Sequence, residues 1–340
     1  MKQLITLSGL VFFVMGILTS CFKEDEKIAP HPFDTTRVEI IPMTQYYSHQ
    51  IYYNLTTNEQ VAQNLKSDYD LMFSASDSGY RIRLNAASFM MAAATNAMQF
   101  ENATDTTGLV WRFDASSGNP DSLAFGDWLV MAGTDTLFPQ RVYIINRGID
   151  DMGRLLGFRK IIFHRLAAGK YHFSYCNLDN SDRREYAVEK DSEYNTVQFS
   201  FATHAALQTE PLKTNWDLLF TQYTTMLVTS EGENYPYLVT GALINPNGVS
   251  VAFDSTMVFD DVVVDDVLYL DYSRRPDVIG YNWKDIYGDI NGGDFYYKCD
   301  PRFNYFIRSR LGVFYKLHFT SFYDPVNGEK GYPTFEHRRL

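Results

Sequence analysis

The chain has 340 residues, with 41 acidic and 30 basic side chains and a formal net charge of −11. Hydrophobic residues make up 45% and charged residues 21%, which is typical of a globular protein and excludes a disordered chain. The acidic balance argues against nucleic-acid binding, because that affinity comes mainly from a basic surface. The 24 Tyr and 25 Phe, against 4 Trp, favour β structure, where aromatic side chains fit the pleated surface.

Residues 1–20 have the pattern of a lipoprotein signal peptide, since Lys2 precedes an apolar run that is too short to span a membrane. Leu18-Thr19-Ser20-Cys21 resembles a bacterial lipobox, in which Cys21 is acylated and begins the mature chain; the alternative is an ordinary signal peptide with an incidental cysteine. Residues 21–36 then form a tether. Its acidic start, Lys23-Glu24-Asp25-Glu26, resembles the signal that exports Bacteroidota lipoproteins to the outer face of the outer membrane. We therefore expect a surface-exposed protein held by acyl chains rather than by a transmembrane helix.

Five sequence blocks occur twice in the same order, which indicates an internal duplication. The clearest pair is LKSDYDLMF at Leu65–Phe73 and LKTNWDLLF at Leu212–Phe220. The other pairs are Ile51–Leu55 with Val197–Phe201, Gly126–Trp128 with Gly280–Trp283, Tyr143–Arg147 with Tyr305–Arg310, and Phe158–Phe163 with Phe314–Phe319. We predict two tandem domains, over residues 37–190 and 191–340.

Most of these blocks alternate with period two and are bounded by turn residues, which is typical of half-buried strands. We predict an all-β fold of two antiparallel sandwich-like or barrel-like domains with little helix. One helix is expected over Ala86–Met98, a run rich in good helix formers. The acidic segment Phe259–Tyr272 is expected to be an edge strand that its five Asp keep soluble.

The blocks of the second half carry a family resemblance. Together with the ending Gly328–Glu336, they resemble the HmuY-like family of Bacteroidota outer-membrane lipoproteins over most of 191–340, and less closely over 37–190, where Tyr69 replaces the motif Trp. The resemblance implies an all-β protein on the cell surface; the best characterised members are haem-binding, haemophore-like proteins that work beside TonB-dependent receptors. The motif residues are expected to be structural, with Trp216 and Phe220 on the core face of a strand and Asp217 accepting hydrogen bonds on the other.

The resemblance also implies that iron ligands come from the variable intervals 74–142 and 221–304. Neither interval contains His, which disfavours a bis-histidine site, but thioether ligation of haem is chemically sound. The methionines in the two intervals are Met90, Met91, Met98, Met131, Met226 and Met257. Met98 and Met131 are the candidate haem ligands of the first domain and Met257 of the second; the alternative is that these side chains only fill the core.

A second candidate site pairs His164 with His172. The segment Phe163–Phe173 is predicted to form a hairpin with a three-residue loop, which places the two imidazoles opposite each other, where they could share a metal ion such as Zn²⁺. The alternative is a half-exposed polar pair, since no third ligand is evident. Cys176 and Cys299 either form one disulfide or remain free thiols.

The sequence contains no metalloprotease, serine-hydrolase, phosphate-loop or EF-hand motif, so no enzymatic activity is expected. The leading hypothesis is a surface lipoprotein that binds haem or another small ligand in nutrient acquisition, with the outer membrane, a TonB-dependent receptor and haem as its partners. The alternative is a non-enzymatic scaffold or partner-binding module associated with a TonB-dependent transporter.

Overall fold

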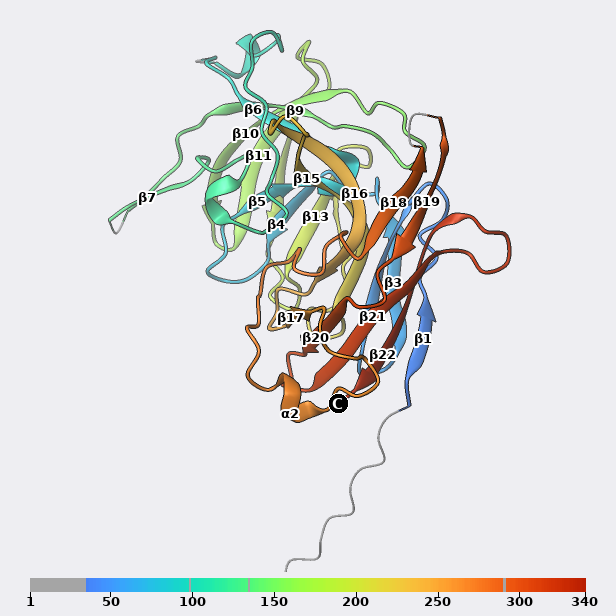
Figure 1. Cartoon of the computed structure of the whole chain (residues 1–340). Coiled ribbons are helices and arrows are strands. Elements are labelled where there is room, and N and C mark those ends of the chain that lie inside the picture. Colours follow the sequence, from blue (N-terminus) through green and yellow to red (C-terminus); the bar gives the residue numbers. More distant parts are fainter. Residues whose placement is uncertain (1–34, 98, 134, 290–291) are drawn as a thin grey trace, which may run out of the picture. The chain divides into compact units, whose positions relative to one another are not determined.

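Antiparallel strands make up nearly all of the regular structure (Figure 1). The computed structural model describes residues 35–97, 99–133, 135–289 and 292–340. The two five-stranded sheets have the orders β1 (Arg37–Ile40), β22 (Lys330–Arg339), β21 (Phe314–Tyr323), β20 (Asn304–Arg308), β17 (Ser250–Asp254), and β12 (Arg184–Glu189), β11 (Lys170–Cys176), β10 (Phe158–Ala167), β9 (Val142–Asn146), β6 (Met91–Ala94). The two four-stranded sheets have the orders β14 (Ala205–Leu207), β13 (Thr196–Ser200), β4 (Leu71–Ser74), β5 (Ile82–Leu84), and β16 (Asn234–Ile244), β15 (Leu218–Val228), β2 (His49–Asn54), β3 (Glu59–Leu65). Two-stranded ribbons and helical turns complete the set: β7 (Val130–Ala132) with β8 (Asp135–Leu137), β18 (Lys284–Asp289) with β19 (Asp294–Cys299), α2 (Val264–Val267), and the 3₁₀ turns η1 (Ala86–Ser88), η2 (Phe100–Asn102) and η3 (Pro120–Ser122).

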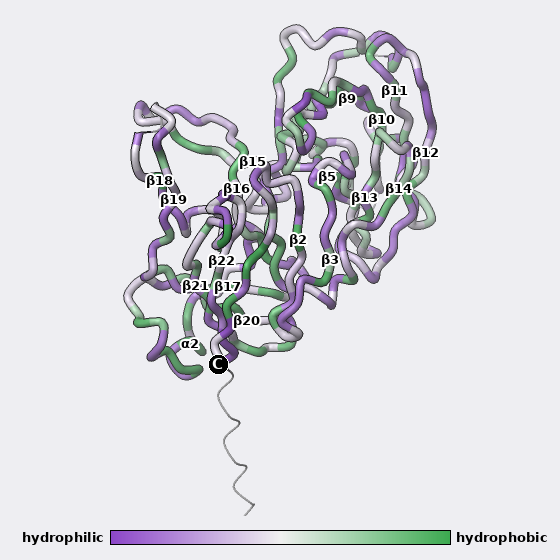
Figure 2. The backbone as a smooth tube through the Cα atoms, turned by 90° about the vertical axis from the view of Figure 1, so that its right-hand side faces the viewer, coloured by the Kyte–Doolittle hydropathy of each residue, from purple (hydrophilic) through white to green (hydrophobic). Residues whose placement is uncertain are grey.

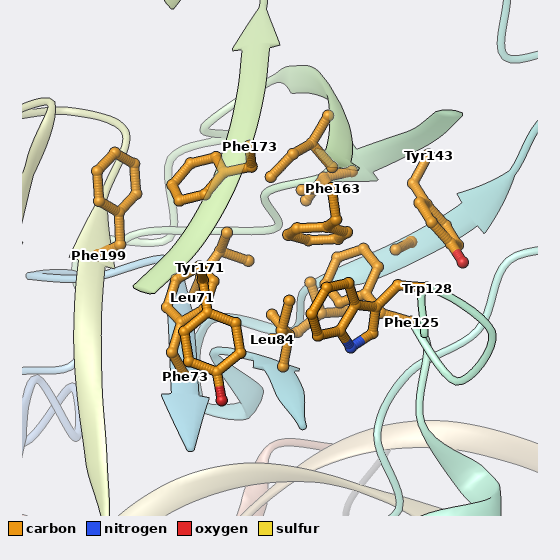
Figure 3. Packing of buried hydrophobic residues seen from close by; sticks show 14 of the residues in the cluster. Leu71, Phe73, Leu84, Phe125, Trp128, Tyr143, Phe163, Tyr171, Phe173 and Phe199 are labelled. Carbon is orange, nitrogen blue, oxygen red and sulfur yellow. The ribbon is translucent and has the colours of Figure 1, made fainter. Parts of the chain in front are cut away.

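One of the two large hydrophobic cores lies between the sheet β12–β11–β10–β9–β6 and the sheet β14–β13–β4–β5. Phe73 from β4 stacks on Phe173 from β11 at a ring-centroid distance of 5.5 Å, and Phe173 meets Phe199 from β13 edge-to-face at 5.1 Å (Figure 3). The buried residues of this core fall between Leu71 and Phe201. We call residues 66–207, which include all of them, lobe A.

The other large core lies between the sheet β1–β22–β21–β20–β17 and the sheet β16–β15–β2–β3. Phe335 from β22 contacts Phe220 from β15 at 5.5 Å and Tyr53 from β2 at 5.3 Å, and Trp283 stacks on Phe319 at 4.0 Å. We call residues 37–65 and 208–340 together lobe B. Figure 2 shows the strands of the two lobes in separate groups, with hydrophobic and hydrophilic stretches interspersed along the chain.

The lobes do not follow the boundary predicted at residue 190. β2 from the first half pairs with β15 from the second, and β13 from the second half pairs with β4 from the first. Lobe A is therefore continuous in sequence and is inserted into lobe B, and all the described residues from 35 onward fall into one compact unit. The tandem duplication stays a prediction, and each lobe takes a hairpin from the other half of the chain.

The repeated motif has the same structural role in both lobes. Asp70 accepts a hydrogen bond from the backbone N–H of Phe201 at 2.7 Å, and Asp217 accepts one from the backbone N–H of Leu55 at 2.8 Å. In each case the motif carboxylate holds the end of a strand that comes from the other half of the chain. The predicted hydrogen-bonding role of Asp217 is confirmed.

The helix predicted over Ala86–Met98 is wrong. Among the described residues 86–97 only η1 is helical, and β6 then pairs with β9 while Ala92 exchanges backbone hydrogen bonds of 2.8 and 2.9 Å with Arg112. Ala92 and Ala93 are at most 1% exposed, so their small side chains let β6 lie close to its neighbours. Strand pairing has overridden the helix propensity of alanine.

The edge strand predicted over Phe259–Tyr272 is also wrong, because the segment forms turns and the short helix α2. Its backbone carbonyls turn inward toward the buried ammonium group of Lys316, which donates to the carbonyl oxygens of Phe259, Asp260 and Val262. Three carbonyls of the segment are thus directed toward one buried cation rather than toward a neighbouring strand. The equivalent block of lobe A contains Lys160, whose ammonium group likewise donates to two backbone carbonyls, at 3.4 Å each.

The predicted signal peptide, most of the predicted tether and Cys21 lie outside the described residues. In the part of the chain that the structure describes, no helix is long and apolar enough to cross a membrane.

Candidate functional site

The outer faces of the two four-stranded sheets face each other across a cavity of about 1150 Å³, which we call the large cavity. In lobe A, the residues that alternate with the core positions on β13, β4 and β5 line it, including Gln198, Met72 and Arg83, which are neighbours in the sheet. In lobe B, Leu219 lines it beside its ladder partners Tyr52 and Leu243. The period-two pattern that buries one face of each sheet therefore also produces the walls of this cavity.

The large cavity is basic although the chain as a whole is acidic. Its charged lining residues are Arg81, Arg83, Lys213, Arg274, Arg275 and Glu210. Glu210 is 6% exposed, and its carboxylate accepts hydrogen bonds from Asn195 and from both the backbone N–H and the hydroxyl of Thr196. Burial raises the pKa of the Glu210 carboxyl and lowers the pKa of the Arg83 guanidinium. Five basic groups thus share the cavity with one carboxylate that already has hydrogen-bond donors.

A second cavity of about 560 Å³, which we call the small cavity, adjoins the first and shares Ser117 and Arg275 with it. Its lining residues are Trp111, Arg112, Phe113, Ala115, Ser116, Ser117, Asp121, Ser122, Leu123, Thr225, Met226, Arg275 and Asp277. All of them come from the two variable intervals, 74–142 and 221–304. The two variable intervals, which lie between the repeated motif blocks, therefore meet at one site.

The wall of the small cavity in lobe A is built around Arg112. Its backbone is held by the hydrogen bonds to Ala92, so the two flanking aromatic side chains, Trp111 and Phe113, lie on the same side of an extended segment. The hydroxyl of Ser116 lies 3.0 Å from that of Thr225 and donates to Asp277 at 2.7 Å. These bonds fix the lobe A loop against β15.

The wall in lobe B carries Met226. This residue is 47% exposed and lies opposite Pro236 in the β15–β16 ladder. β16 is the edge strand of its sheet, which is where a proline is tolerated. The small cavity thus combines aromatic faces, one accessible thioether and the guanidinium group of Arg275, which is paired with Asp277 at 3.0 Å.

Neither Met131 nor Met257 lines either cavity. Met131 is 58% exposed on β7, and Met257 packs against the small cluster of Val262 and Val267 near α2. Figure 1 shows β7 and α2 well apart, with β7 at the left and α2 at the bottom. Met98 lies outside the described residues, and its role stays a prediction.

The predicted opposition of His164 and His172 is wrong. A β-bulge after Phe163 shifts the register, so His172 pairs with Arg165, and the hairpin loop has two residues rather than three. The Nε2 atom of His164 lies 2.7 Å from the hydroxyl oxygen of Ser174. Burial lowers the pKa of both His164 and His172. No group of three or more His, Cys, Asp or Glu in the described residues could hold a metal ion.

The two cysteines of the described chain are free thiols. Cys176 is buried in a small cluster with Phe100, whereas Cys299 packs against the core of lobe B. The disulfide left open by the sequence is therefore not formed.

Sequence reasoning missed Met226, Trp111 and Phe113 as residues of one site. Met226 belongs to the right interval, but only the pairing of β15 with its neighbours shows that its side chain borders a cavity. The sequence does contain a pattern that could have identified two arginines of the large cavity. Arg81 and Arg83 alternate with buried Ile82 and Leu84, which predicts two cations on one outer strand face.

Fold and site together define a class of protein: an all-β, two-lobed binding protein with adjoining cavities between antiparallel sheets. The chain belongs to the HmuY family, because the family described as HmuY protein matches residues 46–337. Among solved structures, it is similar to apo PinO from Porphyromonas gingivitis, with 10% identity over 90% of this chain and 97% of that chain and a TM-score of 0.29. It is also similar to the apo HmuY analog TFO from Tannerella forsythia, with 11% identity over 91% and 99% of the two chains and a TM-score of 0.24. No curated protein matches the chain.

Proposed function

We propose that the protein binds haem in the small cavity. The observation that carries this proposal is the meeting of both variable intervals around one accessible thioether, that of Met226. Membership in the HmuY family supports it, because the best characterised members of that family bind haem. The volume of about 560 Å³ lies within the roughly 300–1,000 Å³ of small-molecule sites.

The lining residues fit haem chemically. Trp111 and Phe113 supply apolar faces against which a porphyrin plane can lie. Met226 supplies a thioether, which is an established axial ligand of haem iron. Arg275, which also pairs with Asp277, supplies a guanidinium group that can bind a propionate carboxylate.

Haemin titration followed by absorbance tests the proposal. The mature protein should show a saturable Soret shift, and Met226→Leu should weaken binding by about tenfold or more and remove the spectral signature of thioether ligation. Met226→His should restore tight binding with a histidine-type spectrum, which a merely structural role of Met226 would not produce.

Three control variants separate this site from the ligands predicted from sequence alone. Met131→Leu and Met257→Leu should bind haemin as the unchanged protein does, because neither side chain lines the cavity. Met98→Leu tests the remaining candidate. A spectrum that is unaffected by Met226→Leu but altered in any of these three variants would contradict the assignment of Met226.

We further propose that the protein is a non-enzymatic carrier, anchored through acylated Cys21 on the outer face of the outer membrane and working beside a TonB-dependent receptor. The lipobox-like junction and the acidic residues after it support the anchor. Cys21→Ala should abolish acylation and membrane association in a whole-cell fractionation. If haemin does not bind, a scaffold or partner-binding role beside such a transporter becomes the better hypothesis.

A further inference from the structure

The large cavity contains two pairs of arginines that come from different lobes. Arg81 and Arg83 lie two residues apart on one face of lobe A, beside β4. Arg274 and Arg275 lie in a lobe B loop that is fixed at both ends: Ser273 pairs with Val251, and the carbonyl of Pro276 accepts a hydrogen bond from the N–H of Ile244 at 2.9 Å.

These charges are only partly neutralised by the protein. Arg275 forms a salt bridge with Asp277 at 3.0 Å, whereas the salt bridges of the described residues include none to Arg81, Arg83 or Arg274. Arg83 donates a long hydrogen bond, of 3.4 Å, to the carbonyl of Gly118, and the buried carboxyl group of Asp114 lies near enough to stabilise its charge in part. Glu210 is directed toward Asn195 and Thr196, as described above. In a chain of net charge −11, the cavity is a local region of positive potential that favours anions.

We propose that the large cavity is a separate binding site for a small polyanionic ligand, one that carries a sugar or aromatic ring and at least two carboxylate or phosphate groups. The planar guanidinium group binds both kinds of anion bidentately, so arginine pairs on two walls suit two acidic groups. Met72, Leu219 and Leu243 also line the cavity and offer an apolar surface to the ring. The site goes beyond haem binding, because it shares only two lining residues with the small cavity.

Calorimetric titration of the mature protein with two anionic probes tests the site. The two probes also distinguish an acidic sugar from a ring-bearing phosphate as its ligand. Trigalacturonate represents acidic sugars and ATP represents ring-bearing phosphates; their neutral counterparts are methyl-esterified trigalacturonate and adenosine. We expect one of the anionic probes to bind with a stoichiometry of one and its neutral counterpart not to bind. Arg81→Gln and Arg274→Gln should each weaken binding by about tenfold, which corresponds to the loss of one charge-assisted hydrogen-bonded contact.

The matched control is Arg302→Gln, which removes the same charge from an exposed side chain paired with Asp300 outside the cavity. Binding in this variant should be unchanged. The proposal is overturned if neither anionic probe binds at millimolar concentration, if the neutral counterparts bind equally well, or if Arg302→Gln weakens binding as much as Arg81→Gln does. If haemin displaces the probe, the large cavity is not a site separate from the haem site, and the proposal is also overturned. Met226→Leu should keep probe binding, so the two proposals fail independently.

Discussion

Replacing Asp70 with Asn should destabilise the protein far more than replacing Asp217, although both carboxylates occupy the same motif position. Asp70 is 2% exposed and accepts two hydrogen bonds from Arg147, from Nε at 2.7 Å and from Nη2 at 3.2 Å. Arg147 is itself only 7% exposed. Asp70→Asn would leave that guanidinium group buried without its counter-charge, which costs about 3–5 kcal/mol of the free energy of unfolding.

Asp217 provides the matched comparison. Its carboxylate accepts the backbone N–H of Leu55, and burial raises the pKa of its carboxyl because the charged form is desolvated. Asparagine keeps an oxygen that can accept the same N–H and carries no charge to desolvate. Asp217→Asn should therefore cost no more than about 1 kcal/mol.

Urea unfolding at pH 7 measures the difference, with Trp128 reporting on lobe A and Trp216 and Trp283 on lobe B by fluorescence. With an m value of about 1–3 kcal/mol per molar urea, a loss of about 4 kcal/mol lowers the midpoint of the lobe A transition by roughly 1–4 M. A double variant, Asp70→Asn with Arg147→Met, should recover much of the loss because no unpaired charge remains. Equal losses in Asp70→Asn and Asp217→Asn would refute the argument from the buried ion pair.

Three further predictions follow from the fold. A fragment of residues 66–207 should fold alone with a cooperative urea transition, whereas residues 37–190, which lack β13 and β14, should not; a folded 37–190 fragment would contradict the inserted-lobe topology. Burial lowers the pKa of Lys284 to about 7, so between pH 7 and 8.5 the unfolded chain holds a proton that the folded chain has lost, and stability should rise with pH. Lys284→Met should reduce that slope and the exposed Lys298→Met should not. Gly241→Ala should destabilise lobe B by about 1–3 kcal/mol, because a Cβ there would lie 2.2 Å from the carbonyl oxygen of Gly280, whereas Gly126→Ala, with its nearest atom at 3.4 Å, should be nearly neutral in thermal unfolding.

The sequence was sufficient to predict the all-β class and several motif roles because these depend on local alternation. Leu218 and Phe220 point into a core, and Asp217 points away from it, as period two requires. The core position predicted for Trp216 is wrong, because this side chain lines the large cavity and packs against Tyr52 at a ring-centroid distance of 5.1 Å. The same alternation at Arg81 and Arg83 would have located one wall of the large cavity. In each case the deciding interaction lies within a few residues of the pattern.

The predictions were wrong where contacts between residues far apart in the sequence determine the local structure. The alanines of β6 are strand residues because β9 and Arg112 supply hydrogen-bond partners from far along the chain. The segment after Val258 is irregular because its carbonyls bind Lys316. One bulge moved His164 out of register with His172. Spacing alone could not favour Met226 over Met257. The two differ in that the side chain of Met226 borders a cavity and that of Met257 does not, which only the folded chain shows.

The insertion of lobe A into lobe B imposes an order on assembly. The hairpin β2–β3 ends at Leu65, but its partner strand β15 begins only at Leu218, so 153 residues must emerge before the hairpin can pair. At about 5–20 residues per second, the nascent hairpin waits for roughly 8–30 s with an open edge, while lobe A already has all its strands. The edge that waits is that of β2, whereas β3 stays the outer strand of the finished sheet, where Glu59, Gln60 and Gln63 place polar and charged groups that discourage pairing with another chain.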